Sequence, residues 1–524
     1  MNRATLSLIA AAVALAAVTG FASLSGPADD GKPAVALAPA RMPVERTSAL
    51  CPAPSLSDVA DTTYTSITPK GADGATAAAD SAGSAELKAT TVAPTDAAPA
   101  DGSDDDTKGK PKDKSKSPKP PKAPAEKKPV VTLKEPGKPV SAKASGADAP
   151  ALVGTATGRL APGWTTQQTT TVDVGGARGL LGVTCTPPDT DFWFPGASTE
   201  DARQDYVHLT NPDDTAAVVD IQMYGKTGVL KSEVGEGIPV PAHSSVPVLL
   251  STLTTEAVAD VTVHVTTRTG RVGAVVRAAD EKAGSDWLPA SADPAAKVVL
   301  PGIPADATDV RLVAFAPGQQ DADLKVQLAG PGGTIVPAGH ESLTVKSGMT
   351  ASVDLADVTK GEAGSVILSQ SQKGQASPVV AALRVVRGKG DKQEIAFIPA
   401  TGPVAARATV ADNRAKGSTL SLTAPGAAAK VKVTASAGTG GGEPAVKTYD
   451  IKAGTTQAVA PPVPEGLKGS YALTVERESG GPVHAARTLA VPEDGVSMFT
   501  VQTLPDDKGT VSVPKAKQDL SILD

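Results

Sequence analysis

The residues best able to carry acid–base or metal chemistry in this 524-residue chain are its histidines. There are five: His208, His243, His264, His340 and His484. A metal centre needs three or four ligands that converge at about 2 Å, and no two of these histidines have a ligand spacing with a further partner nearby. His208, followed by Asp213 and Asp214 in an Asn-Pro-Asp-Asp turn, is the best placed. We therefore expect no metal ligand and no cofactor.

Other catalytic patterns are equally weak. A serine nucleophile on an elbow requires Gly-x-Ser-x-Gly, which the sequence lacks. Paired carboxylates could act on a glycosidic bond, but aromatic residues make up only 3% of the chain and leave little to line a sugar cleft. The acidic run "DGSDDD" from residue 101 lacks the central glycine and final glutamate of a calcium loop. We predict no catalytic residue and expect a protein that is not an enzyme.

An aromatic cluster is the strongest candidate for a binding surface. Phe192, Trp193 and Phe194 are consecutive, and Trp164 precedes them by about 30 residues. One interpretation is a stacking platform for a glycan or a peptide. The other is a plug between an N-terminal domain and the repeats that follow, and Trp287 in a similar context favours it.

Three arginines end runs of small apolar residues in "RVGAVVR", "PVVAALR" and "PVHAARTL". They are Arg277, Arg384 and Arg487, spaced 107 and 103 residues apart. An unpaired buried guanidinium is too costly to keep. An acidic residue lies 43 or 44 positions before each one: Glu233, Glu341 and Glu443. We predict a structural arginine in the closing strand of each repeat, paired with this acid or with backbone carbonyls at a strand end.

The elements that would hold these residues are strands. From residue 190 the chain repeats Pro-containing turns and period-two apolar alternation, with no sustained helical period. Three units of about 100 residues with about seven short strands each match immunoglobulin- or fibronectin-like sandwiches. The recurring segments "DFWFPGA", "DWLPAS" and "IAFIPAT" place the modules at 190–285, 286–395 and 396–505. Residues 506–524 are expected to form a disordered tail.

The region before the repeats predicts a β domain at 44–189, after a disordered linker at 23–43. Its low-complexity insertion at 97–129 is rich in lysine and proline and has no large apolar residue to bury. This tract either contacts an anionic polymer or is a solvated linker. If the only two cysteines, Cys51 and Cys185, form a disulfide, the segments on both sides of the tract belong to one domain.

The first 22 residues indicate export. One arginine precedes an apolar run of signal-peptide length, so this segment is a signal peptide or an uncleaved N-terminal anchor. Either reading places the bulk of the chain outside the cytoplasm, secreted or extracellular. The formal net charge of −6 supplies no basic field for nucleic acid.

The contexts "ALCPAP" and "VTCTPPDTDFWFPGA", the alanine-rich leader and the tandem modules resemble an uncharacterised family of secreted actinobacterial (streptomycete-type) proteins, a domain of unknown function. The resemblance runs from about residue 46 to 505. It implies an exported protein of a high-GC Gram-positive bacterium and brings no activity.

Taken together, the sequence predicts an all-β, exported, non-enzymatic protein of the cell envelope whose sandwiches act as spacers and interaction modules in an elongated array. Its partner would be an envelope protein or a cell-wall glycan. Two alternatives remain, a binding protein for carbohydrate or cell-wall polymer, which needs exposed tryptophans, and an envelope-acting hydrolase, which needs clustered titratable residues in a cleft.

Overall fold

The computed structural model describes residues 40–55, 57–71, 82–92, 128–232, 234–371, 377–493 and 496–514. The leader and most of the linker and of the lysine-proline tract lie outside them. The chain forms two compact units, residues 43–511 and residues 1–42 with 512–524. Regular structure in the described part is β-strand with three short 3₁₀ turns, and no helix there could span a membrane. The all-β prediction is confirmed.

The N-terminal module is a sandwich of two four-stranded sheets. The first sheet has the order β2 (Arg46–Cys51), β8 (Leu152–Thr157), β4 (Ala85–Ala89) and β6 (Val131–Leu133). The second has the order β10 (Gly179–Thr184), β9 (Thr165–Val172), β3 (Asp61–Ile67) and β7 (Val140–Ser145), and the turn η1 (Gly158–Leu160) precedes β9. β4 and β6 flank the tract and pair antiparallel. One domain is therefore built from both sides of the tract, as predicted.

Module 1 is a sandwich of two sheets, and it includes one short strand from the N-terminal module. One sheet contains β11 (Asp191–Ala197), β17 (Val261–Thr269), β13 (Ala217–Gly225), β14 (Gly228–Val229) and β15 (Ile238–Val240). The other contains β19 (Gly284–Leu288), β18 (Gly273–Asp280), β12 (Tyr206–Thr210), β16 (Ser244–Leu249) and β5 (Thr91–Val92), with the turn η2 (Leu250–Thr252) after β16. β5 runs parallel to β16, so the N-terminal module extends a sheet of module 1.

Module 2 repeats this architecture. One sheet contains β20 (Lys297–Ile303), β26 (Gly364–Gln370), β22 (Ala322–Gly330), β23 (Gly333–Ile335) and β24 (Ser342–Val345). The other has the order β25 (Thr350–Asp354), β21 (Ala307–Phe315), β27 (Val380–Arg387) and β28 (Glu394–Pro399), with η3 (Gly390–Lys392) between the last two.

Module 3 is also a two-sheet sandwich. One sheet has the order β29 (Arg407–Asn413), β36 (Tyr471–Gly480), β31 (Ala429–Ala435) and β33 (Ala445–Ile451). The other has the order β34 (Thr455–Val459), β30 (Ser418–Ala424), β37 (His484–Glu493) and β38 (Val496–Leu504). A separate ribbon pairs β32 (Gly441–Glu443) with β35 (Glu465–Lys468), and β1 (Ala40–Pro43) pairs with β39 (Thr510–Val513).

Alternation along each strand builds the cores. In β13, Ala217, Val219, Ile221 and Met223 are buried in the core of module 1, while the residues between them are partly or fully exposed. Successive side chains of a strand point to opposite faces of a sheet, so period-two patterning buries one face. Burying a valine, isoleucine or methionine side chain in this way contributes roughly 1.5–3 kcal/mol.

Two of the three recurring segments, "DWLPAS" and "IAFIPAT", lie at the ends of modules. Trp287 is in β19 and pairs with Arg277 of β18, and Phe397 is in β28 and pairs with Arg384 of β27. These two segments therefore close the module before them, whereas "DFWFPGA" forms β11 in module 1. The boundaries expected at 286 and 396 fall instead in residues 289–296 and 400–406. An aromatic residue before proline marks a strand but does not tell which sheet the strand joins.

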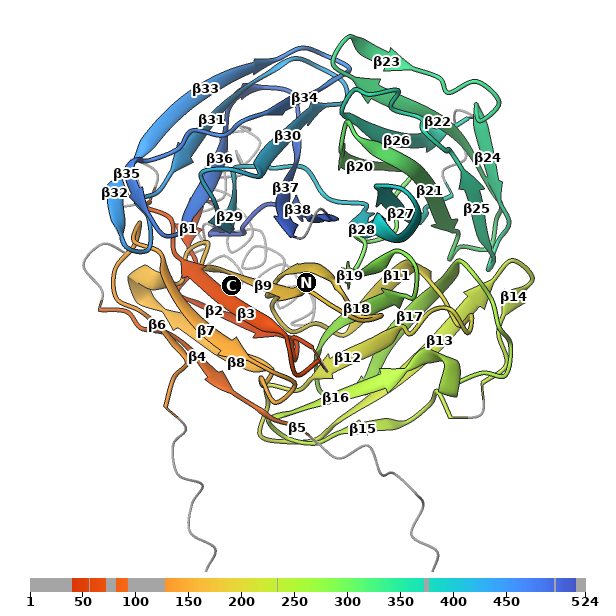
Figure 1. Ribbon diagram of the computed structural model, residues 1–524, viewed down its shortest axis with the longest axis horizontal. Helices are drawn as coiled ribbons and strands as arrows, with labels where there is room; N and C mark the ends of the chain where they lie inside the picture. The colour runs from red at the N-terminus through yellow and green to blue at the C-terminus, as the bar shows by residue number, and fades with distance from the viewer. Residues whose placement is uncertain are drawn as a thin grey trace, which may run out of the picture. The chain divides into compact units, whose positions relative to one another are not determined.

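The four modules meet at their last strands. β10 packs against β19 and β38, and β28 packs against the same two strands; we call these four strands the central junction. Figure 1 shows β19, β28 and β38 toward the middle, with the other strands of their sandwiches outside. The expected elongated array is therefore wrong for residues 43–511, because the first and last modules contact each other.

Polar contacts join modules at the central junction. Arg178, just before β10, donates to a carboxylate oxygen of Glu394 at 3.0 Å and to the carbonyl of Gln393 at 2.7 Å. The same guanidinium donates to the carbonyl of Lys282 at 3.1 Å. One side chain of the N-terminal module thus connects modules 1 and 2.

Candidate functional site

The three repeated arginines do not share one environment. Arg277 is buried, with its guanidinium carbon 5.2 Å from the centroid of the Tyr206 ring. Burial lowers the pKa of Arg277. Arg277 pairs across the sheet with Tyr206 and lies on the face of β18 opposite the core residues Val276 and Ala278, so this arginine points away from the core of its own module.

The predicted glutamate partners are wrong where they can be located. The guanidinium of Arg384 lies 3.8 Å from the Asp309 carboxylate. Glu341 instead accepts a hydrogen bond from the backbone N–H of Gly339, and Glu443 lies in the ribbon strand β32. Glu233 is outside the described residues. A constant offset of about 43 residues does not keep two strands in register, because turn lengths differ between modules.

Arg487 points toward the core of its own module, whereas Arg277 points away from the core of its module. It is fully buried and lies opposite Leu420, whose side chain is in the core of module 3. One guanidinium nitrogen is 3.4 Å from the carbonyl of Ala411, and burial lowers the pKa of Arg487 to about 10. All three arginines lie in the penultimate strand of a module, not in the closing strand as predicted.

The aromatic candidates are buried, so the stacking-platform interpretation is wrong. Trp164 is 8% exposed, and its indole N–H donates to the Ser66 hydroxyl at 2.8 Å. Phe192 and Phe194 belong to the core of module 1. Alternation along β11 sends these two rings inward and Trp193 outward.

Trp193 is a plug, but between modules 1 and 2. Its ring stacks on the rings of His264 and of Phe315 in β21, with centroid distances of 3.6 and 5.2 Å. The expected plug between the N-terminal domain and the first repeat is therefore displaced by one module. Alternation along β11 determines which module Trp193 contacts. It turns Trp193 to the outer face of its sheet, and this face packs against module 2.

The histidines remain apart. Among the described residues no three His, Cys, Asp or Glu side chains form a group that could hold a metal ion. His208 does not meet the acids of the following turn, because Asp213 binds Arg271 and Asp214 binds His243. His208 is buried instead near Trp287, with the two rings 5.2 Å apart.

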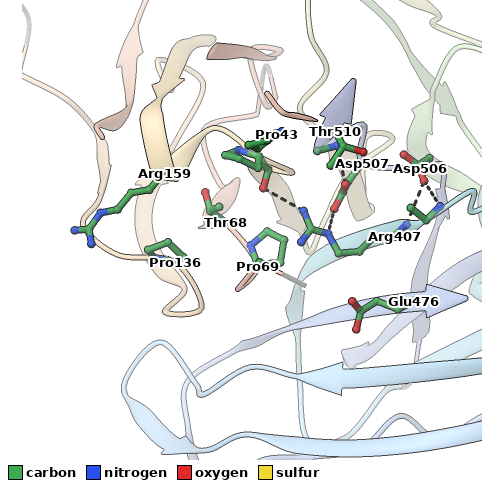
Figure 2. Close-up of a pocket in the computed structure, with 14 residues that line it drawn as sticks. Pro43, Thr68, Pro69, Pro136, Arg159, Arg407, Glu476, Asp506, Asp507 and Thr510 are labelled. Atoms are coloured by element: carbon green, nitrogen blue, oxygen red, sulfur yellow. Dashed lines mark hydrogen bonds and ion pairs between the residues drawn. The ribbon is translucent and has the colours of Figure 1, made fainter. Parts of the chain in front are cut away.

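A first cavity, which we call the seam cavity, lies between the N-terminal module and module 3 (Figure 2). Its volume is about 340 Å³. Its walls include Pro43, Pro69, Pro136 and Pro162. The C-terminal segment also lines it through Asp506, Asp507, Gly509 and Thr510, so the disordered tail expected at 506–524 is wrong for residues 506–510, and residues 515–524 lie outside the described part of the chain.

Arg407 is the centre of the polar groups at this cavity. Its Nε donates to Asp507 at 2.6 Å, and its terminal nitrogens donate to the carbonyls of Lys70 and Pro162 at 3.2 Å. Burial raises the pKa of Asp507 although the guanidinium opposes this. Asp506 accepts backbone N–H groups of Ala406 and Arg407. These contacts tie the two modules together and engage Arg407, Asp506 and Asp507.

A second cavity, which we call the acidic cavity, has a volume of about 260 Å³ and lies where the N-terminal module, module 1 and module 3 meet. Three exposed carboxylates line it: Asp189, Asp191 and Asp293. Its walls include Leu50, and Leu50 precedes the predicted disulfide partner Cys51. The candidates Phe192 and His208 also line it.

Sequence reasoning could place two of these carboxylates beside the aromatic cluster, but Asp293 lies about 100 residues away and carried no signal.

The disulfide fixes the wall of the acidic cavity. Cys51 and Cys185 are joined, with their Cα atoms 4.5 Å apart, as the sequence predicted. Cys51 ends β2 of one sheet and Cys185 follows β10 of the other, so the bond links both sheets of the N-terminal module. Leu50 and Thr186 exchange backbone hydrogen bonds at 2.8 and 3.2 Å beside it. A disulfide fits an oxidising compartment.

Comparison with known families assigns the chain. The model of DUF5719, a family of unknown function, matches residues 140–462. The chain belongs to the DUF5719 family. In this DUF5719 protein the match begins at β7 in the N-terminal module and ends beyond β34 in module 3. It therefore spans parts of all four modules. No curated protein matches the chain.

Proposed function

We propose that this DUF5719 protein is an exported, non-enzymatic binding protein of the cell envelope, with binding sites built between modules. The observation that carries the proposal is the position of the two cavities. Each is lined by residues of at least two modules, so a ligand there would be held by the assembled unit. Pockets at such interfaces are common binding sites in proteins.

Export is supported by the leader of signal-peptide type and by the disulfide. The resemblance to secreted actinobacterial proteins agrees with it. The arrangement of the modules changes the proposed role, because four sandwiches closed on each other cannot act as a spacer. They form a scaffold that presents cavities and loops.

The non-enzymatic part rests on how the titratable residues are used. Arg407 and Asp507 at the seam cavity are paired with each other, and the carboxylates of the acidic cavity face no lysine or arginine among its lining residues. The glycan-binding alternative depended on exposed tryptophans, and Trp164, Trp193 and Trp287 are all buried. Of the two expected partners, an envelope protein and a cell-wall glycan, we therefore retain the envelope protein.

Fractionation of the source organism tests this proposal. A C-terminally tagged full-length chain should be found in the envelope or culture-fluid fraction with its cysteines oxidised. The matched control lacks residues 1–22 and should remain in the cytoplasm with free thiols. Full-length chain in the cytoplasm with reduced cysteines would contradict the proposed export. Release of soluble envelope fragments when the pure protein is incubated with isolated envelopes would contradict the proposed non-enzymatic role.

A further inference from the structure

The hairpin β22–β23 of module 2 corresponds to the hairpin β13–β14 of module 1. Gly225 of β13 matches Gly330 of β22, because each is the last residue of its strand and pairs with the glycine that opens the returning strand. Corresponding residues of the two hairpins are therefore 105 positions apart. Ile335 of module 2 thus takes the place of Leu230 of module 1.

These two matched residues differ in exposure. Leu230 is 3% exposed and belongs to the core of module 1. Ile335 is 58% exposed, although it lies opposite the core residue Leu328 and so shares the core-facing side of its sheet. The next residue, Val336, is 42% exposed, where module 1 has the exposed Lys231. Module 2 therefore presents two aliphatic side chains to solvent where module 1 has a buried leucine and a charge.

The space that Leu230 fills in module 1 is open in module 2. A Cβ atom built on Gly225 would lie 3.2 Å from Cδ2 of Leu230 and 3.6 Å from Cγ1 of Val258. A Cβ atom built on Gly330 would have no side chain of the described residues within 4 Å, apart from its neighbours in sequence. Val258 belongs to the loop between β16 and β17, which has eleven residues, whereas the loop between β25 and β26 has nine. The shorter loop of module 2 leaves this position uncovered.

A third cavity, which we call the module 2 cavity, lies at this place and has a volume of about 270 Å³. Its apolar walls are formed by Leu328, Gly330, Ile335, Val358 and Ala363. Two exposed residues of opposite charge, Lys360 and Glu362, also line it, so the lining selects neither a cation nor an anion. Apolar cavities bind apolar groups, and this one therefore suits an uncharged aliphatic group.

The rim of the module 2 cavity already takes part in a protein contact. Thr334 of β23 lines the cavity, and its hydroxyl donates to the carbonyl of Gly454 in module 3 at 2.8 Å. A partner segment seated in the cavity would extend this contact surface. Adjacent exposed aliphatic side chains beside a cavity mark protein interaction sites, and Leu230 shows which side chain fits at the corresponding place in module 1.

We propose that the module 2 cavity binds a segment of a partner protein through one leucine or isoleucine side chain, which takes the position that Leu230 has in module 1. Ile335 and Val336 cover the inserted side chain from the hairpin. The proposal rests on the binding role proposed above and names the chemistry of the partner. The cavity lies within one module, so it does not depend on the cavities between modules.

Saturation-transfer NMR titrations of the purified, oxidised chain test the aliphatic anchor. The probes are acetyl-Ala-Leu-Ala-amide, its alanine and aspartate counterparts, and sodium octanoate as a free aliphatic chain. Each buried methylene group contributes about fourfold in affinity, and leucine has three more carbon atoms than alanine. The leucine peptide should therefore bind about tenfold more tightly than the alanine peptide, and the aspartate peptide should bind no better than the alanine peptide.

Three variants locate the site. Ala363→Leu extends a wall side chain and should weaken binding of the leucine peptide about tenfold. Ile335→Ser removes the apolar rim and should weaken it about threefold or more. Val229→Ser changes a valine that is 65% exposed on the hairpin of module 1 and does not line the cavity, so it should leave binding unchanged. Each of the three should melt as the parent chain does, which separates loss of binding from loss of fold.

A pair of alanine variants tests the difference between the two modules. Leu230→Ala removes a core side chain and should lower the melting temperature by several degrees. Ile335→Ala changes an exposed side chain and should leave the melting temperature within about one degree of the parent. Equal losses would show that Ile335 already has a partner within its own module, and would overturn the proposal.

Equal binding of the leucine, alanine and aspartate peptides would also overturn the proposal, as would unchanged binding in Ala363→Leu. Octanoate that binds more tightly than the leucine peptide and is lost in Ala363→Leu would show that the occupant is a lipid chain, and would refute the protein partner. These outcomes are independent of fractionation, so an exported chain that fails to bind the leucine peptide would refute this site and leave the proposed location intact.

Discussion

The carboxylate of Asp286 accepts a hydrogen bond from the backbone N–H of Gly182 at 3.0 Å. Asp286 is in β19 and Gly182 is in β10, so this contact joins module 1 to the N-terminal module. The hydroxyl of Thr500, in β38 of module 3, donates to the same oxygen at 3.2 Å. Burial raises the pKa of Asp286 well above its ordinary value. Three modules therefore meet at one buried side chain.

Gly182→Ala should destabilise the whole assembly. A Cβ atom at this position would clash with the Gln502 side-chain amide and would lie 2.6 Å from the Thr500 methyl group. Both side chains are buried, so they or the strand β38 would have to shift, and overpacking of this kind costs about 1–3 kcal/mol. Chemical denaturation should show a lower free energy of unfolding.

The matched control for that variant is Gly176→Ala. No heavy atom lies within 4 Å of a Cβ built at Gly176, and the residue is exposed. Its unfolding free energy should match that of the parent chain within about 0.5 kcal/mol. Equal stability of both variants would show that β10 and β38 are not tightly packed.

Removing the disulfide should destabilise the N-terminal module. The bond between Cys51 and Cys185 closes a loop with a sequence separation of 134 residues, and in the loop-entropy model a bond of this span contributes at most about 5 kcal/mol. The double variant Cys51→Ser with Cys185→Ser should therefore unfold at lower denaturant concentration than the oxidised chain. Reduced parent protein should behave like the double variant. If oxidised and reduced chains unfold together, the bond has no stabilising role.

The repeats, the strand class and the cysteine pairing could be predicted because each depends on local patterning or on residue count. Period-two alternation in β13 is visible in the sequence, and two cysteines allow only one pairing. The insertion of the tract into one domain followed from that pairing.

The packing between modules could not be predicted. A period-two pattern shows that Trp193 and Phe192 face opposite sides of a strand, but not which module lies on the outer side. Arg277 and Arg487 face opposite ways because Arg277 lies five residues after the core residue Val272 and Arg487 four residues after the core residue Val483, and a step of one residue changes the face of a strand. The acidic cavity combines Asp191, Asp293 and Gln502, whose separations in sequence contain no information about their meeting.

Arg311 of module 2 forms an ion pair with Asp260 of module 1. It donates to the carboxylate of Asp260 through two nitrogens at 2.7 and 2.5 Å. Burial alone would raise the pKa of Asp260, but hydrogen bonds from Arg311 and Ser352 outweigh it and the pKa is lowered. Arg311→Met should leave this buried carboxylate without its cation. We expect a loss of about 2 kcal/mol in unfolding free energy, below the range for fully buried pairs because Arg311 is partly exposed.

Glu341→Gln provides the comparison for Arg311→Met. Glu341 was the expected partner of Arg384, but its carboxylate accepts only local backbone N–H groups on the surface. Its replacement should not change stability measurably by thermal or chemical unfolding. A large loss in Glu341→Gln with none in Arg311→Met would show that Glu341 stabilises the fold and that the ion pair of Arg311 with Asp260 does not.

Glu394 should make the stability of the protein fall as pH rises. Burial raises the pKa of Glu394 to about 7 despite the hydrogen bond from Arg178, whereas the unfolded chain has the ordinary value of 4.5. Between about pH 4.5 and 7 the folded chain binds a proton that the unfolded chain does not, so the free energy of unfolding decreases through this window, by about 3 kcal/mol at most. His484 acts in the opposite direction, because burial lowers its pKa to about 4 and stability is lost as pH falls from 6.5 toward 4. The parent chain therefore has to be compared with Glu394→Gln, since both contain His484.

Denaturant unfolding at half-unit intervals from pH 4 to 8 should show Glu394→Gln gaining stability relative to the parent as pH rises to 7 and no further change above it. A constant difference across this range would mean that Glu394 does not titrate in the folded protein.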